Sequence, residues 1–154
     1  MRLQLLIFYV LIALLCTKCQ SPRHSDAPKT EEFTRIEFHF SAFGVESNDL
    51  PNIDGCFDIA RDTSLFKIWF FDPLQPASFY KLTKPEANQL EELVLKMKFS
   101  QRRTEYNSKA TDLPTSSITF CRAKDTFTVH DYGLIGDQPL QDIYKIVYKV
   151  SGIN

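Results

Sequence analysis

The 154-residue sequence has few glycines and almost no excess of charge of either sign. Only five glycines occur, and none belongs to the closely spaced glycine pattern that cradles a nucleotide phosphate. Lysine and arginine number 18 against 19 aspartate and glutamate, which gives a formal net charge of −1. A nucleic-acid-binding domain carries a basic patch or stripe. The composition therefore argues against a phosphate-loop enzyme and against a nucleic-acid partner.

The sequence also lacks an apolar stretch long enough to cross a bilayer. A membrane-spanning helix needs roughly 20 apolar residues, whereas the apolar run Leu5–Leu15 is followed closely by Thr17 and Lys18. One positive charge, Arg2, precedes the run. This layout is typical of a secretory signal peptide. We therefore expect residues 1–19 to be a signal peptide and the remainder to be exported.

Cys16 and Cys19 lie where a lipoprotein signal places the cysteine that becomes acylated. The segment resembles a lipobox, in which an aliphatic residue and two small residues precede the cysteine. We favour Cys19, because the polar sequence Gln20-Ser21-Pro22 follows it directly. Cys16 is the alternative site, and cleavage without lipidation is the alternative route. The expected location is the cell envelope, on the periplasmic or outer-membrane face, with the membrane as a partner through the lipid anchor.

The remaining cysteines are scarce and far apart. Only Cys56 and Cys121 follow the expected lipidation site, and an exported protein can join such a pair in a disulfide. Two buried thiols on separate strands are the other interpretation. Without a close cysteine pair, neither a structural zinc site nor a thioredoxin-like redox centre is expected. No motif calls for a metal or a cofactor.

The chain after the signal divides into a tether and one domain. Residues 20–32 are polar, contain proline and lack large apolar side chains, which is typical of a flexible tether. Residues 33–154 are enough for a single domain with one core. Within this domain, Gly44–Gly55 and Ser100–Lys109 are polar and are expected to be surface loops.

Several segments have the residue pattern of β-strands. Apolar and polar residues alternate over Thr34–Ala42, which predicts a strand with one buried face. Short strands are expected at Cys56–Ala60 and at Ser78–Leu82. Leu65–Phe71 is apolar on both faces apart from one lysine, and such a strand is expected in the centre of a sheet.

The second half predicts two helices around a hairpin. Thr83 and Glu86 match a capping box with proline in the first turn, which predicts that a helix begins there. Ser116–Cys121 and Thr126–Tyr132 are expected to be the arms of a hairpin, and Asp137-Gln138-Pro139 begins the last helix. The order β-β-β-(β)-α-β-β-α predicts an α+β domain. Its sheet is expected to be mostly antiparallel, with five or six strands and both helices on one face.

Three short motifs stand out in this second half. Asp112-Leu113-Pro114-Thr115 precedes a predicted strand, Val129-His130-Asp131-Tyr132 ends the next strand, and Pro139 opens the last helix. These motifs resemble an uncharacterised bacterial family that is common in exported proteins, the domain of unknown function 6438. The similarity spans residues 79–150. After the first strand the family often carries closely spaced cysteines, whereas this chain has Phe43-Gly44-Val45-Glu46. The resemblance implies a fold but no activity.

The residues of these motifs with the most specific positions relative to the predicted strands are Asp112, Pro114, Asp131 and Tyr132. Two carboxylates in a groove at one end of the sheet would suit cation binding or acid–base catalysis. We favour a structural interpretation, in which Asp112 forms the turn before Pro114 by accepting backbone N–H bonds. Asp131 would likewise pair with a backbone N–H or a lysine near the end of the hairpin. His130 and Asp131 are neighbours on a strand, so their side chains point to opposite faces.

These observations favour a non-enzymatic lipoprotein module of the cell envelope. It is expected to bind a protein, peptide or glycan partner through the sheet edge or loops. The chain shows no serine elbow and no helical His-Glu pair. The alternative is a metal-dependent or acid–base hydrolase that uses Asp112, Asp131 and a histidine.

Overall fold

A computed structural model describes residues 33–42, 50–72 and 74–152. The expected signal peptide and tether, with Cys16 and Cys19, lie outside the described residues. The described residues belong to one compact unit, Glu31–Asn154. Among them, no helix is long and apolar enough to cross a membrane.

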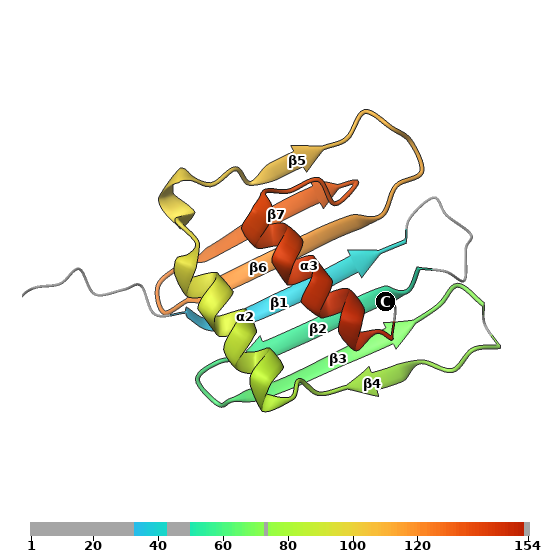
Figure 1. The fold of residues 1–154 in the computed structure, drawn as a ribbon, viewed down its shortest axis with the longest axis horizontal. Coiled ribbons are helices and arrows are strands. Elements are labelled where there is room, and N and C mark those ends of the chain that lie inside the picture. The colour runs from blue at the N-terminus through green and yellow to red at the C-terminus, as the bar shows by residue number, and fades with distance from the viewer. Residues whose placement is uncertain (1–32, 43–49, 73, 153–154) are drawn as a thin grey trace, which may run out of the picture. The chain divides into compact units, whose positions relative to one another are not determined.

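The described chain forms one mixed but mainly antiparallel sheet of seven strands (Figure 1). The strands are β1 (Phe33–Ser41), β2 (Asn52–Asp58), β3 (Thr63–Trp69), β4 (Ser78–Tyr80), β5 (Glu105–Asn107), β6 (Thr115–Arg122) and β7 (Thr126–Tyr132). Their order across the sheet is β4-β3-β2-β1-β6-β7-β5. Only the β5–β7 pair is parallel in this sheet. The expected α+β class is confirmed, with seven strands instead of five or six.

Two helices, α2 (Lys84–Lys96) and α3 (Gln138–Val150), cover one face of the sheet, as expected (Figure 1). A short 3-10 turn, η2 (Phe99–Gln101), follows α2. The predicted capping box is present at the start of α2, where Glu86 accepts hydrogen bonds from the Thr83 backbone N–H at 2.9 Å and from its hydroxyl at 2.8 Å. Pro139 lies in the first turn of α3, where its missing N–H costs no helical hydrogen bond.

The core lies between the helices and the sheet. On β1 the side chains of Ile36, Phe38 and Phe40 are buried, while the residues between them face away from the helices, as the alternation predicts. Leu90 of α2 and Ile143 of α3 are fully buried against this face. Truncating such a side chain to alanine costs about 2–5 kcal/mol. This burial fixes which face of the sheet is inside.

The other face of the sheet carries no helix of the described chain (Figure 1). β3 is the second strand from one edge of the sheet, between β2 and the edge strand β4, and not a central strand as expected for Leu65–Phe71. Leu65 on β3 is 51% exposed and Phe79 on β4 is 65% exposed. We call this surface the uncovered face.

Two segments expected to be loops contain strands. β2 begins at Asn52, inside the expected loop Gly44–Gly55, and Gly55 is required there because a Cβ atom would lie 2.3 Å from the ring of Phe66. β5 lies inside the expected loop Ser100–Lys109. Arg102 in the same segment has only 6% of its side chain exposed and binds Asp137 beside α3 at 2.5 Å. Long-range pairing and a partly buried ion pair therefore order a segment whose composition is polar.

Candidate functional site

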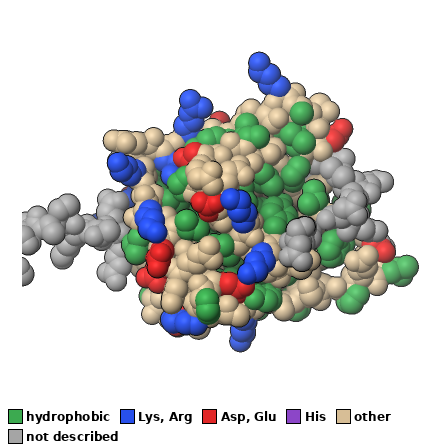
Figure 2. Space-filling model, in the orientation of Figure 1, with side chains coloured by type: hydrophobic (Ala, Val, Ile, Leu, Met, Phe, Trp, Pro, Cys, Tyr) green, Lys and Arg blue, Asp and Glu red, His purple; other side chains and the backbone are tan. Residues whose placement is uncertain are grey.

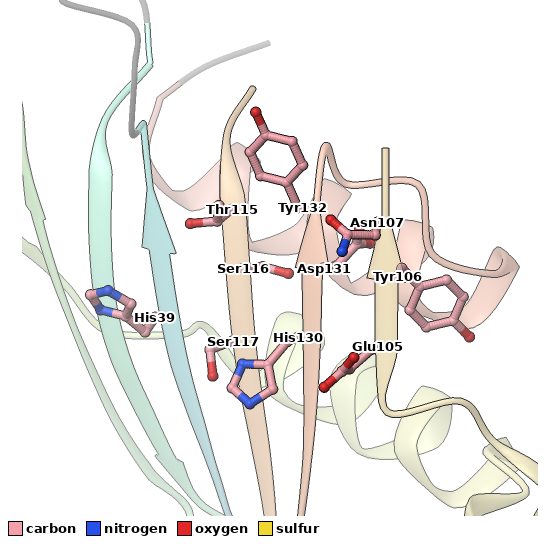
Figure 3. Close-up of a pocket in the computed structure, with 10 residues that line it drawn as sticks. All are labelled: His39, Glu105, Tyr106, Asn107, Thr115, Ser116, Ser117, His130, Asp131 and Tyr132. Atoms are coloured by element: carbon pink, nitrogen blue, oxygen red, sulfur yellow. The ribbon is translucent and has the colours of Figure 1, made fainter. Parts of the chain in front are cut away.

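The uncovered face contains a hollow of about 480 Å³ over β1, β6, β7 and β5 (Figure 3). Strand alternation directs one set of lining side chains outward into the hollow. This set comprises His39, Glu105, Asn107, Thr115, Ser117, His130 and Tyr132. The lining also includes Tyr106, Ser116 and Asp131, whose side chains belong to the opposite face by the same alternation. The hollow is therefore a polar depression on the side away from the helices.

The strand register places five outward side chains in one row. His39 on β1 lies opposite Ser117 on β6, which lies opposite His130 on β7. Glu105 on β5 extends the row at one end, next to His130. Asp54 on β2 extends it at the other end, next to His39. Directly opposite residues have Cβ atoms about 4.5–5.5 Å apart, so these five residues form a continuous strip, which we call the polar row.

The imidazole of His39 is held by its neighbour in the polar row. Its Nδ1 atom lies 2.5 Å from Oδ1 of Asp54, and the two side chains are 60% and 52% exposed. A contact between side chains this exposed contributes little to stability, because solvent screens it. Its effect is to orient the ring at the edge of the hollow.

A second row closes one end of the hollow. Thr115 on β6 lies opposite Tyr132 on β7, and Asn107 on β5 lies beside Tyr132 in the parallel pair. Tyr132 is half-buried, and Figure 3 shows its ring at this end of the site. The site thus combines hydroxyl, amide and imidazole groups with one aromatic ring.

Asp131, a residue with a strong sequence signal, faces the helices instead. Its side chain is buried, with 1% of the residue exposed. Its carboxylate accepts hydrogen bonds from the backbone N–H groups of Ile135 at 3.0 Å and Gly136 at 2.7 Å. It also accepts one from the Tyr144 hydroxyl at 2.7 Å. All three donors belong to the same chain, so the carboxylate bonds within the fold, in agreement with the structural interpretation.

Tyr144 extends this inner network to β6. Its hydroxyl accepts a hydrogen bond from the hydroxyl of Ser116 at 3.1 Å. Burial raises the pKa of Tyr144 far above its usual value, and the hydrogen bond to Asp131 raises it further. The phenol therefore stays protonated and serves as a fixed donor to Asp131. The network ties α3 to the ends of β6 and β7.

Asp112 and Pro114 form the turn that leads into β6. Asp112 is exposed and has a positive φ of 57°, a left-handed conformation that aspartate adopts more readily than most residues. The Pro114 carbonyl accepts a hydrogen bond from Gly133 N–H at 2.8 Å, directly after β7. The hydroxyl of Tyr132 lies 3.5 Å from the backbone nitrogen of Leu113 in the same turn. These residues join the two strand ends.

The residues of the hydrolase alternative do not share a site. Asp131 is buried on the helix side, Asp112 is exposed in a turn, and the histidines His39 and His130 open onto the uncovered face. Within residues 33–42, 50–72 and 74–152, no three histidine, cysteine, aspartate or glutamate side chains are grouped as metal ligands.

Cys56 and Cys121 are free thiols on different strands. Cys56 on β2 lies opposite Glu37, and Cys121 on β6 lies opposite Arg35, so β1 separates the two cysteines. Two strand spacings of about 4.8 Å exceed the Cα separation of roughly 7 Å that a disulfide tolerates. The structure agrees with two separate thiols. Burial raises the pKa of Cys56, whereas a nucleophilic cysteine needs a lowered one.

Sequence reasoning singled out the scaffold of the site and not the hollow itself. The relevant signal was the set of polar outward positions on the two long strands β1 and β6 and on β7. Whether these positions form a site depends on the strand register, which brings His39 beside Ser117. Glu105 and Asn107 lie in a segment whose polar composition predicts a loop, because the pairing of β5 with β7 leaves no local signal in the sequence.

Comparison with known proteins places these features in a family. No curated protein matches the sequence. A family model described as a domain of unknown function, DUF6438, matches residues 75–151, half of the chain. The match runs from before β4 to the end of α3, and so includes Asp112, Asp131 and Tyr144. The chain therefore belongs to the DUF6438 family of domains of unknown function.

Proposed function

We propose that this protein is an exported, lipid-tethered domain that binds a ligand without transforming it, and that the hollow on the uncovered face is its binding site. The observation that carries the proposal is that both helices cover one face of the sheet, while the other face bears a hollow of about 480 Å³ (Figures 1 and 3). This volume lies within the range of roughly 300–1,000 Å³ found for ligand sites.

The polar row supports binding more than catalysis. A serine nucleophile needs a base within hydrogen-bonding reach, and the base needs an orienting group. Asp54 orients His39, but within the described chain the Ser117 hydroxyl makes no hydrogen bond to His39 or His130. Asp131, the most buried carboxylate among the described residues, is held by three donors on the other face.

The face of the sheet suits a ligand better than its edges. The edge strands β4 and β5 contain three residues each, so an added peptide strand would form only a short ladder. On the helix side, basic and acidic side chains are interspersed, and no patch of one sign dominates the visible surface (Figure 2). The surroundings of the helices therefore offer no clear electrostatic site.

The tether follows from the N-terminal sequence. Lipidation at Cys19 would leave residues 20–32 between the membrane anchor and the domain. Thirteen extended residues span at most about 45 Å. Such a tether would let the domain meet ligands at or near the membrane surface.

The proposal is tested by mapping small molecules onto the protein by NMR. A fragment library is titrated into the isotope-labelled full-length chain in detergent micelles, and backbone shifts are followed. We expect fragments to shift residues of β1, β6, β7 and β5 around the hollow, and Ser117→Trp to abolish these shifts by filling it. Thr126→Trp, on the same face at the other end of β7, is the matched control and should preserve them.

Two results would contradict the proposed site. One is a fragment cluster on the helices or on the β3–β4 edge. The other is binding at the hollow that survives Ser117→Trp as well as it survives Thr126→Trp. Substrate turnover by the purified chain would contradict the non-enzymatic part of the proposal.

A further inference from the structure

We infer that the ligand of the hollow is a neutral carbohydrate chain. This inference rests on the proposed function, because it names the ligand class for the same site. It follows from the hydrogen-bonding groups, the charges and the backbone that the hollow presents.

The lining groups match a ligand made of hydroxyls. A sugar hydroxyl both donates and accepts hydrogen bonds, so a complementary surface needs groups that do both. Hydroxyl, amide and neutral imidazole side chains have this property. Six of the outward side chains belong to these types: Thr115, Ser117, Tyr132, Asn107, His39 and His130.

The charges of the site disfavour an anionic ligand. The lining contains no lysine or arginine, and Glu105 is its only outward carboxylate. Phosphate, sulfate and carboxylate ligands are bound by arginine, by lysine or by clustered N–H donors, and a negative side chain in the site repels them. In the described chain no three ligating side chains are grouped so that they could hold a metal ion.

The backbone of the site disfavours a peptide. β1 and β6 have a strand on both sides, and β7 pairs with β5 over His130–Tyr132, where it lines the hollow. The backbone N–H and C=O groups under the hollow are therefore already used in the sheet. An extended peptide recognised by strand addition needs an open edge. A peptide recognised by its side chains needs apolar pockets, whereas the row at the centre of the hollow consists of His39, Ser117 and His130.

Tyr132 supplies the remaining element of a sugar site. The ring of a tyrosine has an apolar face, and one side of a sugar ring is lined by C–H groups. Tyr132 lies at the end of the hollow beside Asn107 (Figure 3). From His39 on β1 to Glu105 on β5 the site crosses three strand spacings, about 14 Å in all. This length exceeds one sugar ring, so the site is open to a segment of a chain.

The test is binding of the labelled full-length chain, in detergent, to an array of neutral, amino-sugar and acidic glycans and of unrelated peptides. We expect binding to at least one neutral glycan, with a dissociation constant that rises at least tenfold in His130→Ala and in Asn107→Ala. Both side chains are exposed, so neither substitution should affect folding. Thr126→Ala, on the uncovered face outside the hollow, should leave the dissociation constant unchanged.

The outcomes separate the ligand class from the site. No binding to any neutral glycan, or binding to acidic glycans or peptides alone, overturns the carbohydrate inference. In that case, fragment shifts at the hollow would still support the proposed site. Binding to a neutral glycan that His130→Ala and Asn107→Ala leave unchanged overturns both the inference and the site.

Discussion

The hydroxyl of Tyr144 donates a hydrogen bond to the buried carboxylate of Asp131, with 2.7 Å between the two oxygen atoms. Tyr144 is on α3 and Asp131 is on β7, so this bond joins the last helix to the sheet. The same carboxylate also accepts two backbone N–H groups from the turn between them. Gly136 in that turn cannot be replaced by a larger residue without a steric clash, because a Cβ atom would lie 2.9 Å from Oδ2 of Asp131. The Val-x-Asp-Tyr motif thus contributes a structural carboxylate.

Loss of the Asp131 carboxylate should destabilise the fold. Asp131→Asn replaces one acceptor oxygen with a donor and leaves buried N–H or O–H groups unpaired, which should cost about 2–3 kcal/mol. Tyr144→Phe removes a single hydroxyl and should cost about 1–2 kcal/mol. Because the two residues share one bond, the double variant should cost less than the sum. Urea unfolding measures all three.

Asp125→Asn is the control for these variants. Asp125 pairs with Arg122 in the hairpin turn, and its side chain is 57% exposed, so its loss should cost less than about 1 kcal/mol. If Asp131→Asn were as mild as this control, the carboxylate would not be structural. A functional role of Asp131 together with Asp112 would then have to be considered again.

The role of Asp112 can be read from a series of substitutions. At a φ of 57°, Asp112→Asn and Asp112→Gly should change stability by less than about 0.5 kcal/mol, because both residues tolerate the left-handed region. Asp112→Val should cost about 1–2 kcal/mol, since a β-branched residue is strained there. Thermal and urea unfolding provide the measurement. A large loss in Asp112→Asn, with Asp112→Val no worse, would show that the carboxylate charge matters and not the backbone conformation.

The parts of the fold that the sequence predicted are those with local signals. The strand around Ile36 alternates regularly, and α2 begins at Lys84, directly after the predicted N-cap Thr83. The register of hairpin β6–β7 keeps Ile118 and Val129 opposite each other and buried. In each case one pattern of side chains or one helix cap is enough to predict the element, because neighbouring residues specify it.

The missed features depend on residues far apart in the chain. β5 has three residues and one aromatic, Tyr106, and it forms by pairing in parallel with β7. Glycine is common in turns, so Gly55 favours the prediction of a turn. In the structure Gly55 lies in a strand, where its lack of a side chain makes room for the ring of Phe66. The polar row exists only once β1 lies between β2 and β6. Positions in one strand therefore could not indicate the hollow.

The capping box of α2 predicts a pH-dependent loss of stability. Partial burial raises the pKa of Glu86, but hydrogen bonds from Thr83 and Tyr80 outweigh this effect and the pKa is lowered. A carboxyl group with a lowered pKa in the folded state stabilises the fold above its unfolded-state pKa. This contribution is lost as the pH falls through the folded-state pKa.

Glu86→Gln should therefore be less stable than the wild type by about 0.5–1 kcal/mol near neutral pH. The difference should shrink once the pH falls below about 4, the region in which glutamate titrates. Urea unfolding at several pH values measures it, and Glu91→Gln on the same helix is the control, with a pH profile like that of the wild type. A gap that stays constant down to about pH 3 would exclude the charge of Glu86 as its cause.

Lipidation at Cys19 gives the last prediction. An acyl chain contributes about 0.8 kcal/mol of membrane affinity per buried methylene, so the acylated protein should fractionate with membranes and incorporate an alkyne-tagged fatty acid. Cys19→Ser lacks the acceptor thiol and should lose both label and membrane association, whereas Cys16→Ser should keep both. Label that persists in Cys19→Ser and disappears in Cys16→Ser would move the anchor to Cys16. An unlabelled, cleaved wild-type protein would instead indicate a soluble exported domain, released without a lipid by ordinary signal cleavage.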